Sequence, residues 1–187
     1  MQHTGAIAAG QLLVATQPGR GGYFDRSVVL LLEHNEESTV GVCLHQPSDT
    51  PVGEILDGFA TQAATPGVIF EGGPVNTEIM LAIGEPATPA APPPGWQQIH
   101  GDLGVIDLAF PSELVATSFG QVRAFVGLSA WSPGQLEGEL IRGSWFRTMV
   151  RPEDVFGDPV GLWRRVLRRM GGATGRWSTW VDDPTVN

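Results

Sequence analysis

The chain has 187 residues, of which 42% are hydrophobic and 17% charged, values typical of a globular domain rather than a disordered chain. Its formal charge of −9 at pH 7 means that most of its surface repels phosphates, which argues against nucleic-acid binding through overall charge. The longest aliphatic run, residues 28–32, is too short to span a bilayer, and no signal peptide is evident at the start. We therefore expect one cytoplasmic domain over residues 1–187 with no membrane association.

The first half of the chain predicts short strands separated by turns. Strands are expected at residues 12–15, 28–32, 39–45, 68–70 and 79–83, with a short helix at 53–56. The run at 28–32 is apolar on both faces, as in a central strand that is covered on each side. Pro47 is expected to end the strand at 39–45. Residues 85–95 contain five prolines and predict an exposed, polyproline-like surface loop.

The second half predicts strands at 104–108 and 121–128, a helix near Pro111 between them, and two further helices. The first follows a capping box at Ser132 to Gln135, with Pro133 at the first helical position, and ends at Gly143. The second covers residues 160–170, and residues 172–187 are expected to form a C-terminal tail. Because strands and helices do not alternate strictly, we predict an α+β (or irregular α/β) fold with a mixed sheet.

Four segments of the chain resemble the AlgH/YqgE family. Residues 24–35 are similar to its F-x-R-S-V segment that ends in E-H-N, residues 41–47 to its G-V turn segment, Gly72–Val75 to its G-G-P-V element, and residues 127–139 to its G-Y-x-G-W-x-x-G-Q-L-E-x-E segment. The resemblance implies a mixed, partly barrel-like β-sheet flanked by helices. It implies no biochemical activity, and the label of transcriptional regulator that is sometimes attached to the family specifies no mechanism.

The chain departs from this family's pattern at four positions. The family usually has an aliphatic residue, Asn, Tyr and Gly where this chain has Cys43, His45, Leu128 and Ala130, respectively. A function that depended on these four positions is therefore not expected here.

Polar residues at a strand end and at a helix start are the first candidates for a ligand site. Glu33, His34 and Asn35 follow the buried strand, and Trp131 and Gln135 flank a helix start whose free amides favour an anion. If the two segments meet in the fold, they form a binding surface for a small molecule or a protein partner. The structural alternative is that Glu33 pairs with Arg26 or caps an amide and that Asn35 turns the chain.

Arg26 and the helix at 160–170 are candidates for anion binding. Arg26 offers a bidentate fork for a carboxylate or phosphate, and a buried structural ion pair is its alternative role. On the helix, the apolar residues occupy one face, and the opposite face carries Arg164, Arg165, Arg168 and Arg169. This basic face could meet phosphates, anionic lipid or an acidic partner, or its arginines could be solvated or paired with the chain's own acids.

Catalytic chemistry has weaker support in the sequence. Cys43 and His45 share one face of a predicted strand, as a thiol nucleophile and its base would, but the favoured interpretation is that Cys43 is a small buried hydrophobe beside a strand-end histidine that bonds a turn. The G-x-S-x-G pattern of a serine hydrolase is absent, and one cysteine with four scattered histidines does not predict a metal site. We therefore expect a non-enzymatic, ligand- or partner-binding protein with a regulatory role and no metal or cofactor. A nucleic-acid-binding regulator and a hydrolase or thiol enzyme are the alternatives.

Overall fold

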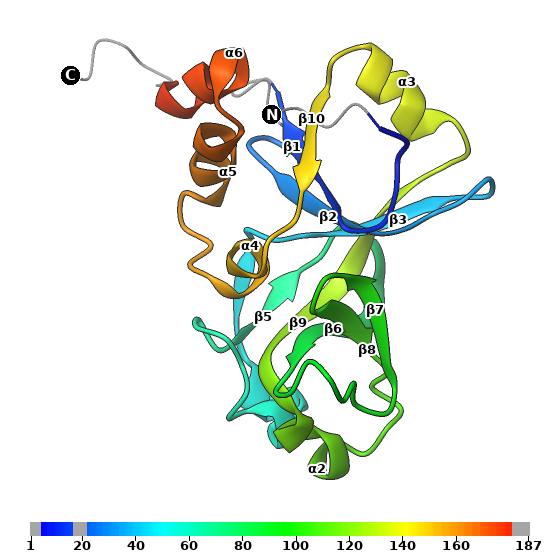
Figure 1. The fold of residues 1–187 in the computed structure, drawn as a ribbon, viewed down its shortest axis with the longest axis vertical. Helices are drawn as coiled ribbons and strands as arrows, with labels where there is room; N and C mark the ends of the chain where they lie inside the picture. Colours follow the sequence, from blue (N-terminus) through cyan, green and yellow to red (C-terminus); the bar gives the residue numbers. More distant parts are fainter. Residues whose placement is uncertain (1–4, 17–21, 181–187) are drawn as a thin grey trace.

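The structure, a computed structural model, describes residues 5–16 and 22–180, whose strands form one curled sheet (Figure 1). The strands are β1 (Gln11–Ala15), β2 (Val28–His34), β3 (Thr39–Cys43), β4 (Pro47–Pro51), β5 (Val68–Glu71), β6 (Val75–Pro86), β7 (Trp96–His100), β8 (Leu103–Ile106), β9 (Phe119–Trp131) and β10 (Trp145–Met149). Their order is β10-β1-β2-β3-β9-β6-β8-β7, with β5 beside β9 and β4 beside β5. The β5–β9 pair is parallel and the other strand pairs are antiparallel, so the sheet is mixed.

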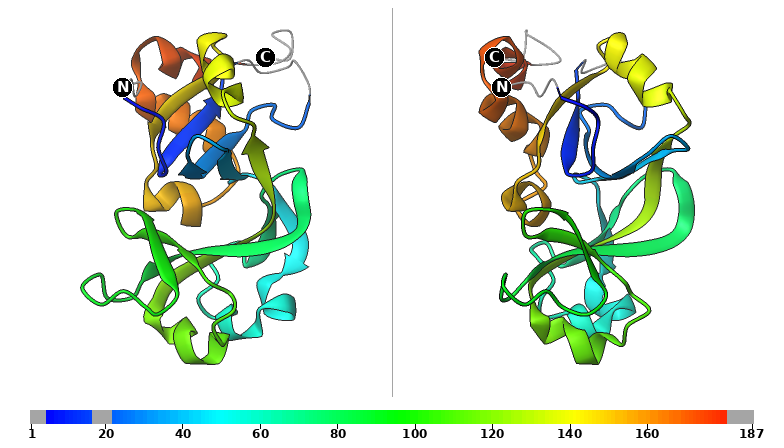
Figure 2. Two further views of the ribbon diagram at one scale, coloured as in Figure 1. Left: turned by 90° about the vertical axis from the view of Figure 1, so that its right-hand side faces the viewer. Right: turned by 45° about the vertical axis from the view of Figure 1, so that its right-hand side comes forward.

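Short helices flank this sheet. They are α1 (Val52–Ile55), α2 (Ser112–Val115), α3 (Gln135–Ile141), α4 (Pro152–Phe156), α5 (Leu162–Met170) and α6 (Gly172–Gly175), with 3-10 turns at Asp57–Phe59, Ala116–Ser118 and Arg176–Thr179. The long strands β6 and β9 curve through the molecule, and β9 continues upward to pair with β3 (Figure 2). The predicted α+β fold with a mixed, partly barrel-like sheet flanked by helices is confirmed.

The sheet around β1 is covered on both faces. Helix α5 lies on one side of β1 and β10 and helix α3 on the other (Figure 1). Because side chains alternate along a strand, Leu12 and Val14 of β1 pack in the core under α5, whereas Leu13 and Ala15 pack in the core under α3. The continuous apolar sequences of β1 and β2 are thus explained by burial on two faces.

A buried arginine joins this upper part to the lower half of the sheet. Arg123 of β9 is 1% exposed and lies over the Phe70 ring, 4.2 Å from the ring centroid to the guanidinium carbon. Its guanidinium donates to the carbonyls of Val155, Pro66, Thr65 and Gly157 at 3.0–3.1 Å. Burial lowers the pKa of Arg123 to about 10, so the group stays charged at neutral pH and ties α4 to the sheet.

Several predicted strand and loop boundaries were wrong. Pro47 and Pro51 bound a strand of their own, β4, which tolerates proline because it pairs with β5 alone. Glu85 and Pro86, assigned to the loop at 85–95, are the end of β6 and pair with β9, so the irregular segment is 87–95. Strands β7 and β10 and helix α4 were not predicted.

The helix ends also differ from the prediction. Helix α3 begins at Gln135, after Gly134 in a left-handed conformation (φ 74), so Pro133 precedes the helix. The Gln135 side chain does accept from the Ser132 N–H at 3.1 Å, but the serine side chain forms no cap bond. The predicted tail at 172–187 is helical over 172–179, where Trp177 packs against the core, and residues 181–187 lie outside the described part of the chain.

Candidate functional site

The carboxylate of Glu139 on α3 accepts hydrogen bonds from three side chains. Its Oε2 accepts from the indole N–H of Trp131 at 2.9 Å and of Trp145 at 2.7 Å, and its Oε1 accepts from the Gln135 amide at 3.0 Å. Both tryptophans are buried, and an indole N–H can only donate, so each needs an acceptor inside the protein. A carboxylate has about four acceptor positions, which leaves Oε1 able to accept one more bond.

Aromatic rings from a distant loop complete this cluster. The Phe24 ring lies 6.3 Å from that of Trp131 in a stacked arrangement, and 5.8 Å from that of Trp145 edge to face. The Tyr23 ring packs on Phe24 at 5.1 Å. The Ser27 hydroxyl donates to the Phe24 carbonyl at 2.8 Å and closes the turn that carries both rings. The loop before β2 is thereby fixed against α3 and β10.

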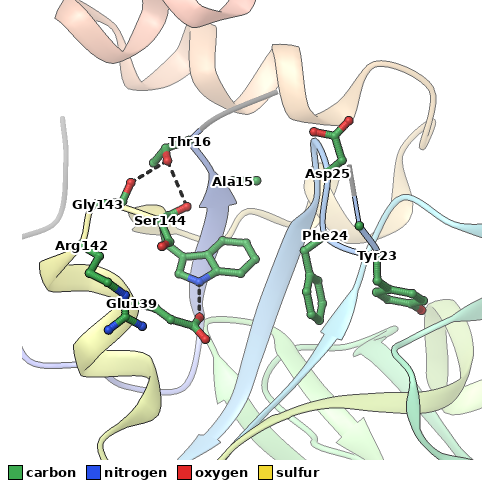
Figure 3. A pocket seen from close by; sticks show the side chains of 11 residues that line it. Ala15, Thr16, Tyr23, Phe24, Asp25, Glu139, Arg142, Gly143 and Ser144 are labelled. Atoms are coloured by element: carbon green, nitrogen blue, oxygen red, sulfur yellow. Dashed lines mark hydrogen bonds between the residues drawn. The ribbon is translucent and has the colours of Figure 1, made fainter. Parts of the chain in front are cut away.

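A cavity of about 610 Å³ lies between this loop and the end of α3. Figure 3 shows Tyr23, Phe24 and Asp25 on one side, and Glu139, Arg142 and Ser144 on the other. The volume falls within the range of small-molecule pockets. We call this cavity, with its lining residues Ala15, Thr16, Gly22, Tyr23, Phe24, Asp25, Glu139, Arg142, Gly143, Ser144 and Trp145, the Glu139 pocket.

Two of the hydroxyl residues that line the Glu139 pocket, Thr16 and Tyr23, differ in their surroundings. The Thr16 hydroxyl lies 2.6 Å from the Gly143 carbonyl and donates to it, which fixes the chain after α3. Burial, with smaller contributions from Cys43 and Glu71, raises the pKa of Tyr23 to about 12. The phenol is therefore protonated at neutral pH.

The structure brings the two predicted ligand-binding segments into contact, but not as one pocket. His34 lies 2.6 Å from the Thr39 hydroxyl through Nδ1 and 3.7 Å from Glu137 of α3 through Nε2. Asn35 accepts from the amides of Glu37 and Ser38 and donates to Glu33 at 2.6 Å. These contacts fit the alternative stated in the sequence analysis, in which Asn35 forms a turn rather than a ligand site.

The other predicted ligand residues are divided between two places. Trp131 and Gln135 donate to Glu139 and so help to hold its carboxylate, but they are not among the lining residues of the Glu139 pocket. Arg26, which has a left-handed φ of 53, lines a different cavity beside the start of α5.

The arginine face of α5 is largely engaged within the chain. Arg164 donates to the carbonyls of Ser178 and Trp180, both at 2.6 Å, and Arg165 donates to those of Asp158 and Val160. Arg169 forms an ion pair with Asp154 at 2.7 Å. Arg168 is exposed. Three of the four arginines therefore connect α5 to neighbouring segments.

Cys43 is a buried core residue, as the favoured interpretation of the sequence expected, and not an activated nucleophile. The Cys43 thiol is fully buried and contacts the Ser129 hydroxyl at 3.6 Å. Burial raises the pKa of Cys43 to about 11, so the thiol is protonated at neutral pH and a poor nucleophile. Ser129 itself donates to the Gly72 carbonyl at 3.0 Å. These are the contacts of packed core residues.

The glycines of the resembling segments allow close backbone approach. A Cβ atom on Gly72 would lie 2.4 Å from the Gly127 carbonyl oxygen, and one on Gly73 would lie 2.1 Å from that of Leu128. The G-G-P-V element thus packs directly on β9, as a tight turn rather than a phosphate-binding loop.

In the described part of the chain, no three His, Cys, Asp or Glu side chains gather as metal ligands, and no helix is long and apolar enough to cross a membrane.

The curled mixed sheet flanked by helices places the chain in the class of α+β proteins that the four sequence segments predicted. The chain belongs to the AlgH-like family, whose model matches residues 12–175. It is 43% identical over 182 residues to a UPF0301 protein of Streptomyces avermitilis, covering 95% of this chain and 94% of that protein. It is 39% identical over 166 residues to a UPF0301 protein of Mycobacterium tuberculosis, covering 87% of this chain and 82% of that protein.

Two solved structures share the fold. A crystal structure of a Corynebacterium diphtheriae protein has a TM-score of 0.85 and 30% identity, with 95% of each chain covered. The solution structure of the AlgH protein from Pseudomonas aeruginosa has a TM-score of 0.67 and 21% identity, covering 98% of this chain and all of that one, a likeness in fold. The family assignment made from the sequence is confirmed.

Sequence reasoning missed the residues that face the Glu139 pocket. Tyr23, Arg142 and Trp145 were not singled out as ligand residues, and neither were Phe24 and Glu139. A signal existed for the last two, because Phe24 opens one of the family-like segments and Glu139 closes another. Only the fold shows that these segments meet.

Proposed function

We propose that the protein is a non-enzymatic binding protein that holds a small organic ligand in the Glu139 pocket and serves a regulatory role in the cytoplasm. The observation that carries this proposal is the pairing of one remaining acceptor position on Glu139 with an aromatic wall. A polar group that is held rigidly beside apolar surface is the usual design of a ligand pocket.

The lining chemistry favours a ligand with an apolar body and a cationic group. Tyr23, Phe24 and Trp145 offer apolar ring surface, and aromatic faces also attract cations. The carboxylates of Glu139 and Asp25 supply negative charge at the same cavity, and the net charge of −9 draws cations toward the protein. Arg142, which lies on the same side of the cavity as Glu139, suits a carboxylate, so a zwitterion can meet groups of both charges here.

A binding role fits the lining better than a catalytic one. The described lining residues include the hydroxyls of Thr16, Tyr23 and Ser144, but no histidine or cysteine beside them to activate a nucleophile. The Glu139 carboxylate is committed to three donors. Such a group orients its neighbours and accepts one further bond from a ligand.

The proposal is tested by titrating the protein with small amines and amino acids, each paired with its N-acetyl derivative, which lacks the ammonium charge, and following binding by calorimetry. We expect the ammonium member of a pair to bind and its N-acetyl derivative to bind about tenfold more weakly or not at all, since a charge-assisted hydrogen bond contributes about 1.5–3 kcal/mol. Tyr23→Ala should weaken binding, and Ile141→Ala should not, because Ile141 is the last residue of α3 but is 87% exposed and outside the lining. Equal binding of both members of every pair, or of both variants, would contradict the proposal.

A further inference from the structure

Another cavity, of about 430 Å³, lies where the β7–β8 hairpin faces the end of β2 and the start of β3. Figure 1 shows β7 and β8 below β2 and β3. The cavity, which we call the β7 groove, is lined by Leu32, Glu33, Val40, Leu81, Gln97, Gln98, Ile99, Val105 and Leu128. Six of these nine residues are aliphatic, one from each of six strands, and all six are half-buried. The groove therefore has an apolar surface that the described part of the chain does not fully cover.

An unpaired edge of the sheet lies along the β7 groove. Strand β7 is the last in the strand order and pairs with β8 alone, so its other edge has no strand partner in the described part of the chain. Three of its five residues, Gln97, Gln98 and Ile99, line the groove. The backbone N–H and C=O groups on such an edge can bond an added strand. The groove thus combines apolar surface with backbone groups that are able to pair.

The walls of the β7 groove are acidic. Between residues 27 and 122 the chain has twelve Asp and Glu residues and no Lys or Arg. Four of these acids belong to the two hairpins that border the groove, namely Glu33, Glu36, Glu37 and Asp102. Glu33 lines the groove itself, and one oxygen of its carboxylate accepts from the Asn35 side chain at 2.6 Å, which leaves the other oxygen for a ligand. These charges favour a cationic partner.

We propose that the β7 groove binds an extended segment of a partner protein, which adds to the edge of β7 as a further strand and carries apolar residues alternating with basic ones. Side chains of a strand alternate in direction, so one set enters the apolar groove while the other points out toward its acidic rim. Bonds to the β7 backbone supply affinity, and the groove and its charges supply specificity. The acidic walls repel phosphates, so a nucleic acid is a poorer match than a basic protein segment.

The proposal is tested with a six-residue peptide in which valine and arginine alternate, long enough to cover the five residues of β7 at about 3.3 Å per residue. It is compared with a peptide that has glutamate in place of arginine, and with two forms N-methylated on either the valine or the arginine amides. NMR of the whole protein follows the amides of Gln97, Gln98, Ile99 and Val105.

We expect the valine–arginine peptide to give saturable shifts of these amides with a dissociation constant below about 1 mM. The valine–glutamate peptide should bind about tenfold more weakly or not at all, because its charges repel those of the groove walls. N-methylation of at least one set of amides should abolish binding, because it removes the donors that pair with β7.

Two pairs of variants locate the binding surface. Ile99→Lys places a cation among the lining residues and should weaken binding at least about tenfold, whereas Ile79→Lys places the same charge at a β6 position that is 43% exposed and outside the lining, and should leave binding within about twofold. Glu33→Gln should weaken binding about threefold at low salt, and Glu113→Gln, which removes the same charge on α2, should not. Circular dichroism checks that each variant is folded.

Several results would overturn the proposal. They are the absence of saturable binding of the valine–arginine peptide, equal binding of the valine–glutamate peptide, retained binding of both N-methylated forms, and equal effects of Ile99→Lys and Ile79→Lys. A concentration-dependent dimer that Ile99→Lys abolishes would show that the occupant is a second copy of this chain instead. The β7 groove and the Glu139 pocket share no lining residue among those described, so Ile99→Lys should leave amine binding unchanged and Tyr23→Ala should leave peptide binding unchanged.

Discussion

At the scale of single residues, Glu139 connects the stability of the upper core to the shape of the pocket. Trp131 and Trp145 are 3% and 6% exposed, and both indole N–H groups depend on the same carboxylate oxygen. Glu139 therefore fixes two core rings through one oxygen, accepts from Gln135 through the other, and is also a lining residue of the pocket. A substitution of Glu139 should therefore affect both the packing of the upper core and the shape of the pocket.

Glu139→Ala should lower the free energy of unfolding by about 2–5 kcal/mol, because it leaves two buried indole donors without an acceptor. The measurement is urea unfolding followed by far-ultraviolet circular dichroism. Glu137→Ala is the matched control on the same helix. Its carboxylate is 44% exposed and lies 3.7 Å from His34, so its loss should cost at most about 1 kcal/mol. Equal losses in the two variants would show that the indole bonds to Glu139 do not carry this stability.

The Cys43 thiol gives the fold a dependence on alkaline pH. Its pKa is raised from 9.0 to about 11 by burial, so the folded state holds the proton more tightly than the unfolded state. Below pH 9 both states are protonated and this stability is fully present; it is lost as the pH rises from 9 through 11. Cys43→Ala should flatten the fall in stability over this range, measured by urea unfolding at a series of pH values. An unchanged pH profile in Cys43→Ala would show that the thiol does not cause the loss of stability. Tyr23→Phe removes the other group with a raised pKa and measures how much of the loss in stability comes from the phenol.

At the scale of elements, the sequence predicted those whose pattern is strong and local. The alternation of apolar and basic residues on α5 is visible because both faces repeat along one helix, and its five apolar residues are indeed buried. Strand β2 was predicted because burial on two faces gives a continuous apolar run. Val160 and Gly161 were included in the helix by pattern, but the left-handed Gly161 delays its start.

The missed elements lack such a local signal. In β7 the side chains are intermediate or exposed, so no apolar alternation marks it, and β10 is mostly half-buried at the edge of the sheet. The Glu139 pocket was missed for a related reason. Phe24 and Trp145 are far apart in sequence and become neighbours through the order β10-β1-β2, which no local pattern encodes.

At the scale of the whole molecule, the two halves of the sheet are locked where the G-G-P-V element crosses β9. The Gly72 carbonyl accepts from the Cys43 amide at 2.8 Å and from the Ser129 hydroxyl at 3.0 Å, so β3, β9 and the turn before β6 meet at one point. The absence of side chains on Gly72 and Gly73 is what permits this approach. The core under α3 and the lower half of the sheet should therefore unfold together.

Gly73→Ala tests this coupling. The added Cβ would lie 2.1 Å from the Leu128 carbonyl oxygen, a contact with backbone that cannot move without shifting β9. We expect a loss of about 2–4 kcal/mol in unfolding free energy, with tryptophan fluorescence and circular dichroism still reporting one coincident transition. Gly101→Ala is the control, because Gly101 also has a positive φ, 56°, but no atom within 4 Å of the added Cβ, so its cost should be limited to about 1–2 kcal/mol of backbone strain. If Gly73→Ala instead split the unfolding into two transitions, or cost no more than Gly101→Ala, the turn would not be the point that couples the two halves.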